Sequence, residues 1–271
     1  MAPKKPATKK PGTAMQSWDE KLAKLAEISA GVEDSVNLGG NYISLKGGVF
    51  SYNGGTIPGN KMNVIVLDHV LENVYYEGRY DPDNPQSPVA FALGRDEETL
   101  RWHEDSDERY AGELCKDSDI NQWGSADTGR GKAAKNLRRL ALITEDSLEH
   151  IADADVAMLK IPVTSVKAWA GYVRSLADQL KRPPLAVVTE IGIIPDAKTQ
   201  FKLTFKLIGT IDDGDTIGEL IEKRDTVEQM LFAPYVRQEA APEPQRGRAR
   251  AAQAPARSKV AAKAPAASKR R

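Results

Sequence analysis

The chain has 271 residues, with 38 Lys and Arg, 38 Asp and Glu, and one Cys. Hydrophobic residues make up 41% and charged residues 28%, which is typical of a globular protein. No apolar run approaches the ~20 residues of a membrane-spanning helix, and no apolar stretch follows the basic N-terminus as it would in a secretory signal. A single Cys cannot form an internal disulfide, which indicates a reducing compartment. We therefore expect a cytoplasmic protein without a membrane partner.

The zero net charge hides an uneven distribution. Residues 1–14 carry four Lys and residues 245–271 carry nine Lys and Arg, and neither stretch contains an acid. Without those thirteen cations, 25 basic residues face all 38 acidic ones in 15–244. We predict disordered basic tails at 1–16 and 237–271 around a folded body at 17–236, because the tails cannot bury enough apolar area. Such tails resemble those of linker histones, and both nucleic-acid binding and a solubilising role fit them.

The body is predicted to begin with a helix at Ser17. Ser17 and Glu20 have the spacing of a capping box. The apolar residues that follow recur at helical spacing: Trp18, Leu22 and Leu25. The folded part of the chain is therefore expected to start with this helix.

Strand signals follow the helix. Residues 49–52 lead into Asn53-Gly54, which predicts a tight hairpin turn because both residues tolerate positive φ. Residues 62–76 are rich in Val, Ile and Tyr and predict a long buried strand, and residues 88–93 predict another. The three prolines in 78–88 make the connection a loop.

The C-terminal half mixes helices and strands. Apolar residues at helical spacing predict an amphipathic helix that Pro183-Pro184 ends: Val166, Trp169, Val173, Leu176 and Leu180. Residues 185–194 and 201–207 predict strands, and 216–231 a last helix. Strands dominate and do not alternate regularly with helices. The predicted fold is therefore mainly β with appended helices (α+β), as an antiparallel barrel rather than a parallel sheet.

Residues 121–140 form an unusual basic, Gly-rich segment. Gly124 and Gly129 have the spacing of a P-loop, but Arg130 and Gly131 stand where that motif needs Lys and Ser or Thr. An NTPase is therefore a poor interpretation. The segment is better interpreted as a mobile basic loop beside aromatic groups.

Single-stranded nucleic acid binds to cations that follow the phosphates and to aromatic faces on which bases stack. The candidate cations are Arg130, Lys132, Lys135, Arg138 and Arg139, and the candidate stacking residues are Trp123, Trp102, Tyr75, Tyr76 and Tyr80. The alternative for each residue is structural, because strands are rich in aromatics and basic residues often form a solvated face. The clustering within one segment favours binding.

Catalytic patterns are weak, so we expect no enzyme activity and no cofactor. His69 lies within a strand-like run, where a core role is the simpler interpretation, and His103 lies in an acidic loop-like stretch. The sequence contains no Gly-x-Ser-x-Gly or His-Glu-x-x-His motif.

Three segments resemble a family of early proteins from tailed bacteriophages: 54–82, 123–140 and 160–169. The resemblance covers about residues 17–210. Members of this family look like the single-stranded-DNA-binding proteins of phage replication. The resemblance implies an OB-like barrel with insertions, single-stranded DNA as the ligand, phage replication proteins as possible partners, and the host cytoplasm as location.

The chain departs from that family at a possible metal site. Cys115, Ser118 and Ala134 stand where relatives have cysteines. A structural zinc needs four ligands, and His103 and Cys115 are the strongest nearby donors. We therefore expect no metal, and we expect the loop 103–135 to be held by packing around Trp102 and Trp123.

Two function hypotheses follow. The first is non-enzymatic single-stranded DNA binding by the body in replication or recombination. The second is an interaction or structural protein whose basic tails alone bind nucleic acid, non-specifically. RNA binding also stays open, because stacking platforms accept both sugars.

Overall fold

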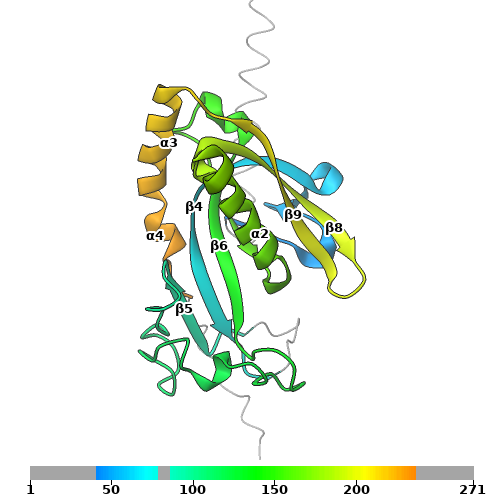
Figure 1. The fold of residues 1–271 in the computed structure, drawn as a ribbon, viewed down its shortest axis with the longest axis vertical. Coiled ribbons are helices and arrows are strands. Elements are labelled where there is room, and N and C mark those ends of the chain that lie inside the picture. Colours follow the sequence, from blue (N-terminus) through cyan, green and yellow to red (C-terminus); the bar gives the residue numbers. More distant parts are fainter. Residues whose placement is uncertain (1–40, 79–85, 236–271) are drawn as a thin grey trace, which may run out of the picture. The chain divides into compact units, whose positions relative to one another are not determined.

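The structure, a computed structural model, describes residues 41–78 and 86–235 (Figure 1). The helix predicted at Ser17, both predicted tails and Tyr80 lie outside the described residues. Within those ranges the chain is mixed α+β, and its largest element is one seven-stranded sheet. This confirms the expected mainly β fold with appended helices.

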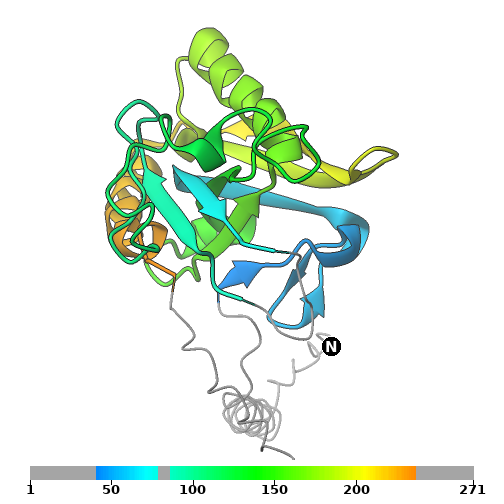
Figure 2. The same ribbon diagram turned by 90° about the horizontal axis from the view of Figure 1, so that it is seen from below.

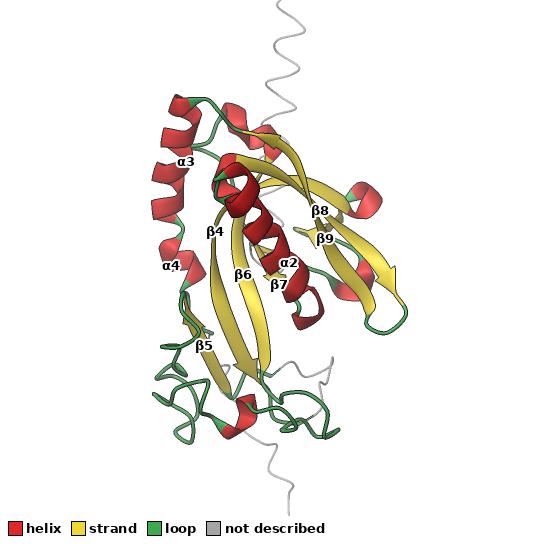
Figure 3. Ribbon diagram, in the orientation of Figure 1, coloured by secondary structure: helices red, strands yellow, loops and turns green. Residues whose placement is uncertain are grey.

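The elements follow one another in chain order, as Figure 3 shows. The strands of the large sheet are β1 (Tyr42–Ile43), β4 (Lys61–Tyr75), β5 (Ala90–Gly94), β6 (Lys135–Thr144), β7 (Ala157–Ile161), β8 (Val187–Asp196) and β9 (Gln200–Thr210). A separate hairpin joins β2 (Ser51–Tyr52) and β3 (Gly55–Thr56). The α-helices of the described residues are α2 (Val163–Ser175), α3 (Gly214–Thr226) and α4 (Glu228–Leu231).

The long strand β4 organises the sheet. β6 pairs antiparallel with one edge of β4, from Val64 opposite Thr144 to Val74 opposite Lys135. Two strands pair with the other edge of β4: β8 pairs with residues 61–64 and β5 with residues 71–75. β7 and β1 continue the sheet beyond β6, and β9 continues it beyond β8. Among the described residues no pair joins β1 to β9, so the sheet stays open and the expected OB-like barrel is not observed as a closed barrel.

Several local predictions are confirmed. Asn53 and Gly54 both have positive φ, of 47° and 75°, in the turn between β2 and β3. The predicted strand at 62–76 is β4, and α2 continues as a π-helical turn over 176–180 before Pro183-Pro184. The predicted last helix is divided into α3 and α4. Turn chemistry and apolar periodicity act over a few residues, so they can be read without tertiary information.

The basic segment is divided differently from the prediction. Residues 135–140, predicted as loop, form the first half of β6 in the middle of the sheet. Three cations and an Asn obscure the strand pattern there, because a strand is recognised by its apolar alternation. β4 and β7 pair with this stretch on its two sides, and that pairing decides its conformation.

Hydrophobic cores lie on both faces of the sheet. Trp169 of α2 packs with Val64, Val66, Leu140 and Leu142. The alternate residues of the same strands pack with Leu220 of α3 and Leu231 of α4. Figures 1 and 2 show α2 and the α3–α4 pair on different sides of the sheet. Successive strand residues point to opposite faces, so one strand serves both cores. None of the helices in the described ranges is long and apolar enough to cross a membrane.

Candidate nucleic-acid interface

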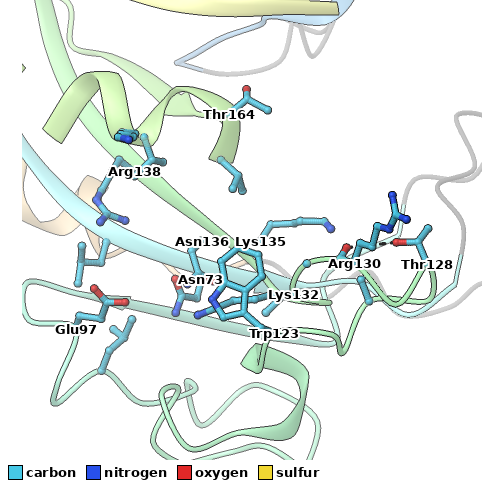
Figure 4. Close-up of a pocket in the computed structure, with 18 of the residues that line it drawn as sticks. Asn73, Glu97, Trp123, Thr128, Arg130, Lys132, Lys135, Asn136, Arg138 and Thr164 are labelled. Atoms are coloured by element: carbon cyan, nitrogen blue, oxygen red, sulfur yellow. Dashed lines mark hydrogen bonds between the residues drawn. The ribbon is translucent and has the colours of Figure 1, made fainter. Parts of the chain in front are cut away.

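A cavity of about 860 Å³ lies where the sheet, α2 and the Gly-rich loop meet. The Gly-rich loop is defined here as residues 122–134. The ends of β4 and β6 supply Asn73, Asn136 and Arg138, and the first turns of α2 supply Thr164 and Lys167. Figure 4 shows Thr164 on the helix side, Arg130 and Thr128 on the loop side, and the strands between them. Residues distant in the sequence therefore line one space, which we call the cationic cavity.

The Gly-rich loop is tied down by its own hydrogen bonds. The backbone N–H groups of Gly124 and Ala126 both donate to the carbonyl of Gly131, at 2.8 and 3.4 Å. Ser125 Oγ donates to the carbonyl of Ile120 and accepts from the N–H of Ala133. Gly124 and Gly131 have φ of 92° and 96°, a backbone region that side chains with a Cβ rarely adopt. The glycines therefore allow the chain to fold back and present its side chains.

Trp123 is the aromatic side chain that this loop presents. Its side chain is 82% exposed, whereas Trp102 and Trp169 are each 1% exposed. Figure 4 shows its indole ring in front of the strand residues of the cavity. An exposed large aromatic side chain at the mouth of a cavity offers a flat apolar face to a ligand. Trp123 does not hold the loop together by packing, so that part of the prediction for the loop 103–135 is wrong.

The charge of the cavity is mainly positive. Its cations are Arg130, Lys132, Lys135, Arg138 and Lys167, and its carboxylates are Glu97 and Asp127. None of the five cations lies within ion-pair distance of a carboxylate of the described residues. Burial lowers the pKa of Arg138, and the charge of Glu97 offsets this only in part. The guanidinium of Arg138 is thus a half-buried cation that has no partner carboxylate in the described part of the chain.

The predicted binding residues divide into three groups. The structure brings five of them together in the cationic cavity: Trp123, Arg130, Lys132, Lys135 and Arg138. Tyr75, Tyr76, Trp102 and Arg139 are not among its lining residues, and Tyr80 lies outside the described residues. Half of the predicted set therefore shares one site.

Arg139 is the clearest correction. Its side chain is buried on the opposite face of β6 from Arg138, and its Nη2 donates to Glu72 Oε1 at 2.5 Å. Its Nη1 donates to the carbonyls of Leu231 and Ala233. Because these contacts use the guanidinium inside the protein, it cannot follow a phosphate. Arg139 is a structural residue.

The aromatic candidates on β4 and in the following insertion also need correction. Trp102 is buried with Ala90, Leu100 and Cys115. Tyr75 is partly buried and packs edge-on against Tyr110, with ring centroids 5.8 Å apart. Tyr76 is 44% exposed but is not part of the cationic cavity. Trp102 and Tyr75 are therefore core residues, in line with the structural alternative.

Sequence reasoning missed the other parts of the cavity. Lys167 and Thr164 lie at the start of α2, about thirty positions after the Gly-rich loop, and no local pattern joins the two. Asn73 and Asn136 are cross-strand partners in the register of β4 and β6. The sequence held one signal for this region, because an apolar strand followed by Pro162 and a helix predicts that the helix begins close to the end of that strand. Nothing in the sequence pointed to the two amides.

The three positions of the possible zinc site, Cys115, Ser118 and Ala134, are all buried. Cys115 and Ala134 belong to one buried cluster, and Ser118 is also fully buried. Burial raises the pKa of the Cys115 thiol to about 12, so the thiol stays protonated at neutral pH. Within residues 41–78 and 86–235, no group of three or more His, Cys, Asp and Glu is placed to hold a metal ion. His69 is half-buried and packs edge-on against Trp169.

The cationic cavity can thus offer an aromatic face, unpaired cations and neutral amides to one ligand. Comparison with known proteins adds no assignment. No protein-family model, no curated protein and no solved structure matches this chain.

Proposed function

We propose that this chain binds single-stranded DNA, without catalysis, through the cationic cavity. The observation that carries the proposal is Trp123, 82% exposed at a cavity whose five cations have no carboxylate partner within ion-pair distance among the described residues. Stacked aromatic faces and a cationic path are the two features that proteins use to hold single strands. Base stacking on an aromatic ring needs an unpaired, accessible base, which favours single strands over duplex.

The roles of the residues follow from their positions. Arg130 and Lys132 in the Gly-rich loop, Lys135 at the start of β6 and Lys167 on α2 would accompany the phosphates along the cavity. The first turn of α2 adds N–H groups and the positive end of the helix dipole beside Thr164. Leu71, Leu100 and Val166 supply apolar walls for a base or sugar. These groups support binding and include no nucleophile–base pair.

The setting in phage DNA replication or recombination, with phage replication proteins as partners, rests on the sequence resemblance alone. The OB-like architecture also stays part of this proposal. The open sheet is compatible with DNA binding, because the proposed contacts come from α2, the Gly-rich loop and two strand ends. Closure of a barrel is not needed to place them.

The test is a fluorescence titration of the full chain with oligo-dT at several salt concentrations. Among the described residues Trp102 and Trp169 are buried and Trp123 is exposed, so stacking of a base on Trp123 should quench the emission of that side chain. We expect Trp123→Leu to lose this quenching and to weaken binding roughly tenfold, because stacking contributes about 1–3 kcal/mol per base. Binding should also weaken as salt rises, since phosphate contacts release counterions.

A double variant separates the cavity from the tails. Lys132→Ala with Lys135→Ala should weaken binding of oligo-dT, whereas the matched control Lys206→Ala, an exposed Lys of β9 outside the cavity, should not. If all variants bind like the wild type and emission does not change, the cavity is not the site. Equal binding of single and double strands would then support the alternative, in which the basic tails bind alone.

A further inference from the structure

The floor of the cationic cavity holds a hydrogen-bond acceptor without a donor. The side-chain oxygen Oδ1 of Asn136 is buried and has no hydrogen-bond partner. Asn136 lies directly opposite Asn73 in the pairing of β6 with β4, and both residues line the cavity. Figure 4 shows the two side chains behind the indole of Trp123.

A buried acceptor of this kind is unfavourable unless something donates to it. The neighbouring cations do not supply this donor, because no hydrogen bond joins Asn136 Oδ1 to Lys132, Lys135 or Arg138. Asn136 lines the cavity, and the χ2 angle of Asn has a broad energy profile, so its amide can rotate at little cost. A ligand with a donor could therefore complete the site.

The chemistry of the donor identifies the part of the ligand. A phosphate group offers only acceptor oxygens, which Asn136 Oδ1 would repel, and an internal deoxyribose has no hydroxyl. Every nucleobase carries an N–H on the edge that is used in base pairing. Asn136 Oδ1 can thus accept a hydrogen bond from the pairing edge of a base, while the cations of the cavity bind the phosphates.

We propose that Asn136 reads the pairing edge of one unpaired base, with Oδ1 accepting from a base N–H while the base lies against Trp123. This inference rests on the proposed single-strand binding and adds its selectivity. In duplex DNA the pairing edges are occupied, so the floor rejects paired bases. Single-strand preference then comes from a hydrogen bond as well as from stacking.

The test compares oligo-dT with an oligonucleotide of N3-methylthymidine of equal length, with the full chain. The methyl group removes the N3–H donor but keeps the ring, the sugar and the phosphates. We expect the methylated strand to bind roughly tenfold more weakly, because Asn136 Oδ1 then stays buried without a hydrogen-bond donor. The variant Asn136→Leu should bind both strands with equal affinity, because it has no acceptor to satisfy. The control Asn63→Leu, at an exposed amide outside the cavity, should keep the difference.

The outcomes separate this inference from the proposed function. If neither strand binds, single-strand binding itself is wrong. If wild-type protein binds both strands equally, or if Asn136→Leu still discriminates, strand binding stands and base reading by Asn136 is wrong. Circular dichroism shows whether Asn136→Leu folds, and if it does not, the wild-type comparison decides alone.

Discussion

Arg138 and Arg139 are adjacent in β6 and lie in opposite environments. Arg138 borders the cationic cavity, half-buried and without a carboxylate partner among the described residues. Arg139 lies on the other face, where Glu72, Lys160 and Tyr235 surround it. Two identical side chains thus lie in two different environments, since successive strand residues face opposite sides of the sheet. The comparison teaches that a cation is free for a ligand only where the fold provides no internal anion.

The Arg139 side is an ion cluster that holds the end of the described chain. Glu72 is 0% exposed and accepts from Arg139 and from Tyr235 Oη, the latter at 2.7 Å. Lys160 Nζ donates to Tyr235 Oη at 2.7 Å and lies 3.3 Å from Glu72 Oε1. The rings of Tyr42 and Tyr235 both lie under the Lys160 ammonium. The cluster therefore fastens residues 231–235 to the sheet.

The largest expected effect comes from removing the buried cation. Arg139→Met should lower the free energy of unfolding by about 3–5 kcal/mol, because Glu72 loses its closest partner inside the protein. Urea denaturation followed by circular dichroism measures this. A loss below about 1 kcal/mol would mean that Lys160 alone compensates Glu72.

The pH dependence of stability probes the same cluster. Burial by itself would raise the pKa of Glu72, but Lys160, Arg139 and Tyr235 together lower it below its ordinary value. A carboxyl group with a lowered pKa in the folded state stabilises the protein above its unfolded pKa of about 4.3, and this contribution is lost as the pH falls through the folded value. Glu72→Gln should therefore be less stable than the wild type at pH 7.

The difference between the two proteins should shrink as the pH falls below about 4.3, because the carboxyl group then takes up a proton in the unfolded state before it does so in the folded state, whose pKa is lower. Denaturation curves at a series of pH values from neutral to acid measure it. A difference that does not change with pH would show that Glu72 contributes by packing and not by charge.

The smallest effect on stability is expected at the neighbouring residue. Arg138→Met should change the free energy of unfolding by less than about 1 kcal/mol, since Arg138 forms no ion pair within residues 41–78 and 86–235. It should weaken oligo-dT binding several-fold and reduce the slope of log affinity against log salt by about 0.7, as expected for one lost phosphate contact. The measurements are oligo-dT titrations at several salt concentrations and urea denaturation, each carried out on Arg138→Met and Arg139→Met in parallel. If both variants lowered the free energy of unfolding equally, the claim that Arg139 stabilises the fold and Arg138 does not would be wrong.

Local chemistry was sufficient for much of the fold. The Asn53-Gly54 turn, the long apolar run of β4 and the apolar periodicity of α2 are properties of a few neighbouring residues. The basic Gly-rich segment was likewise visible as a candidate binding site from charge and glycine content alone. Five predicted residues do line one cavity there.

Tertiary structure decided the rest, because burial and pairing depend on residues far apart in the chain. Only the register of β4 with β6 places Asn73 opposite Asn136, and only the packing of α2 brings Lys167 to the cavity. Trp102 and Trp123 looked equivalent in sequence, yet one is 1% exposed and the other 82%. The sequence by itself determined which side chains were available, and the strand pairing determined which of them face a ligand, since a shift of one residue reverses the face of a strand.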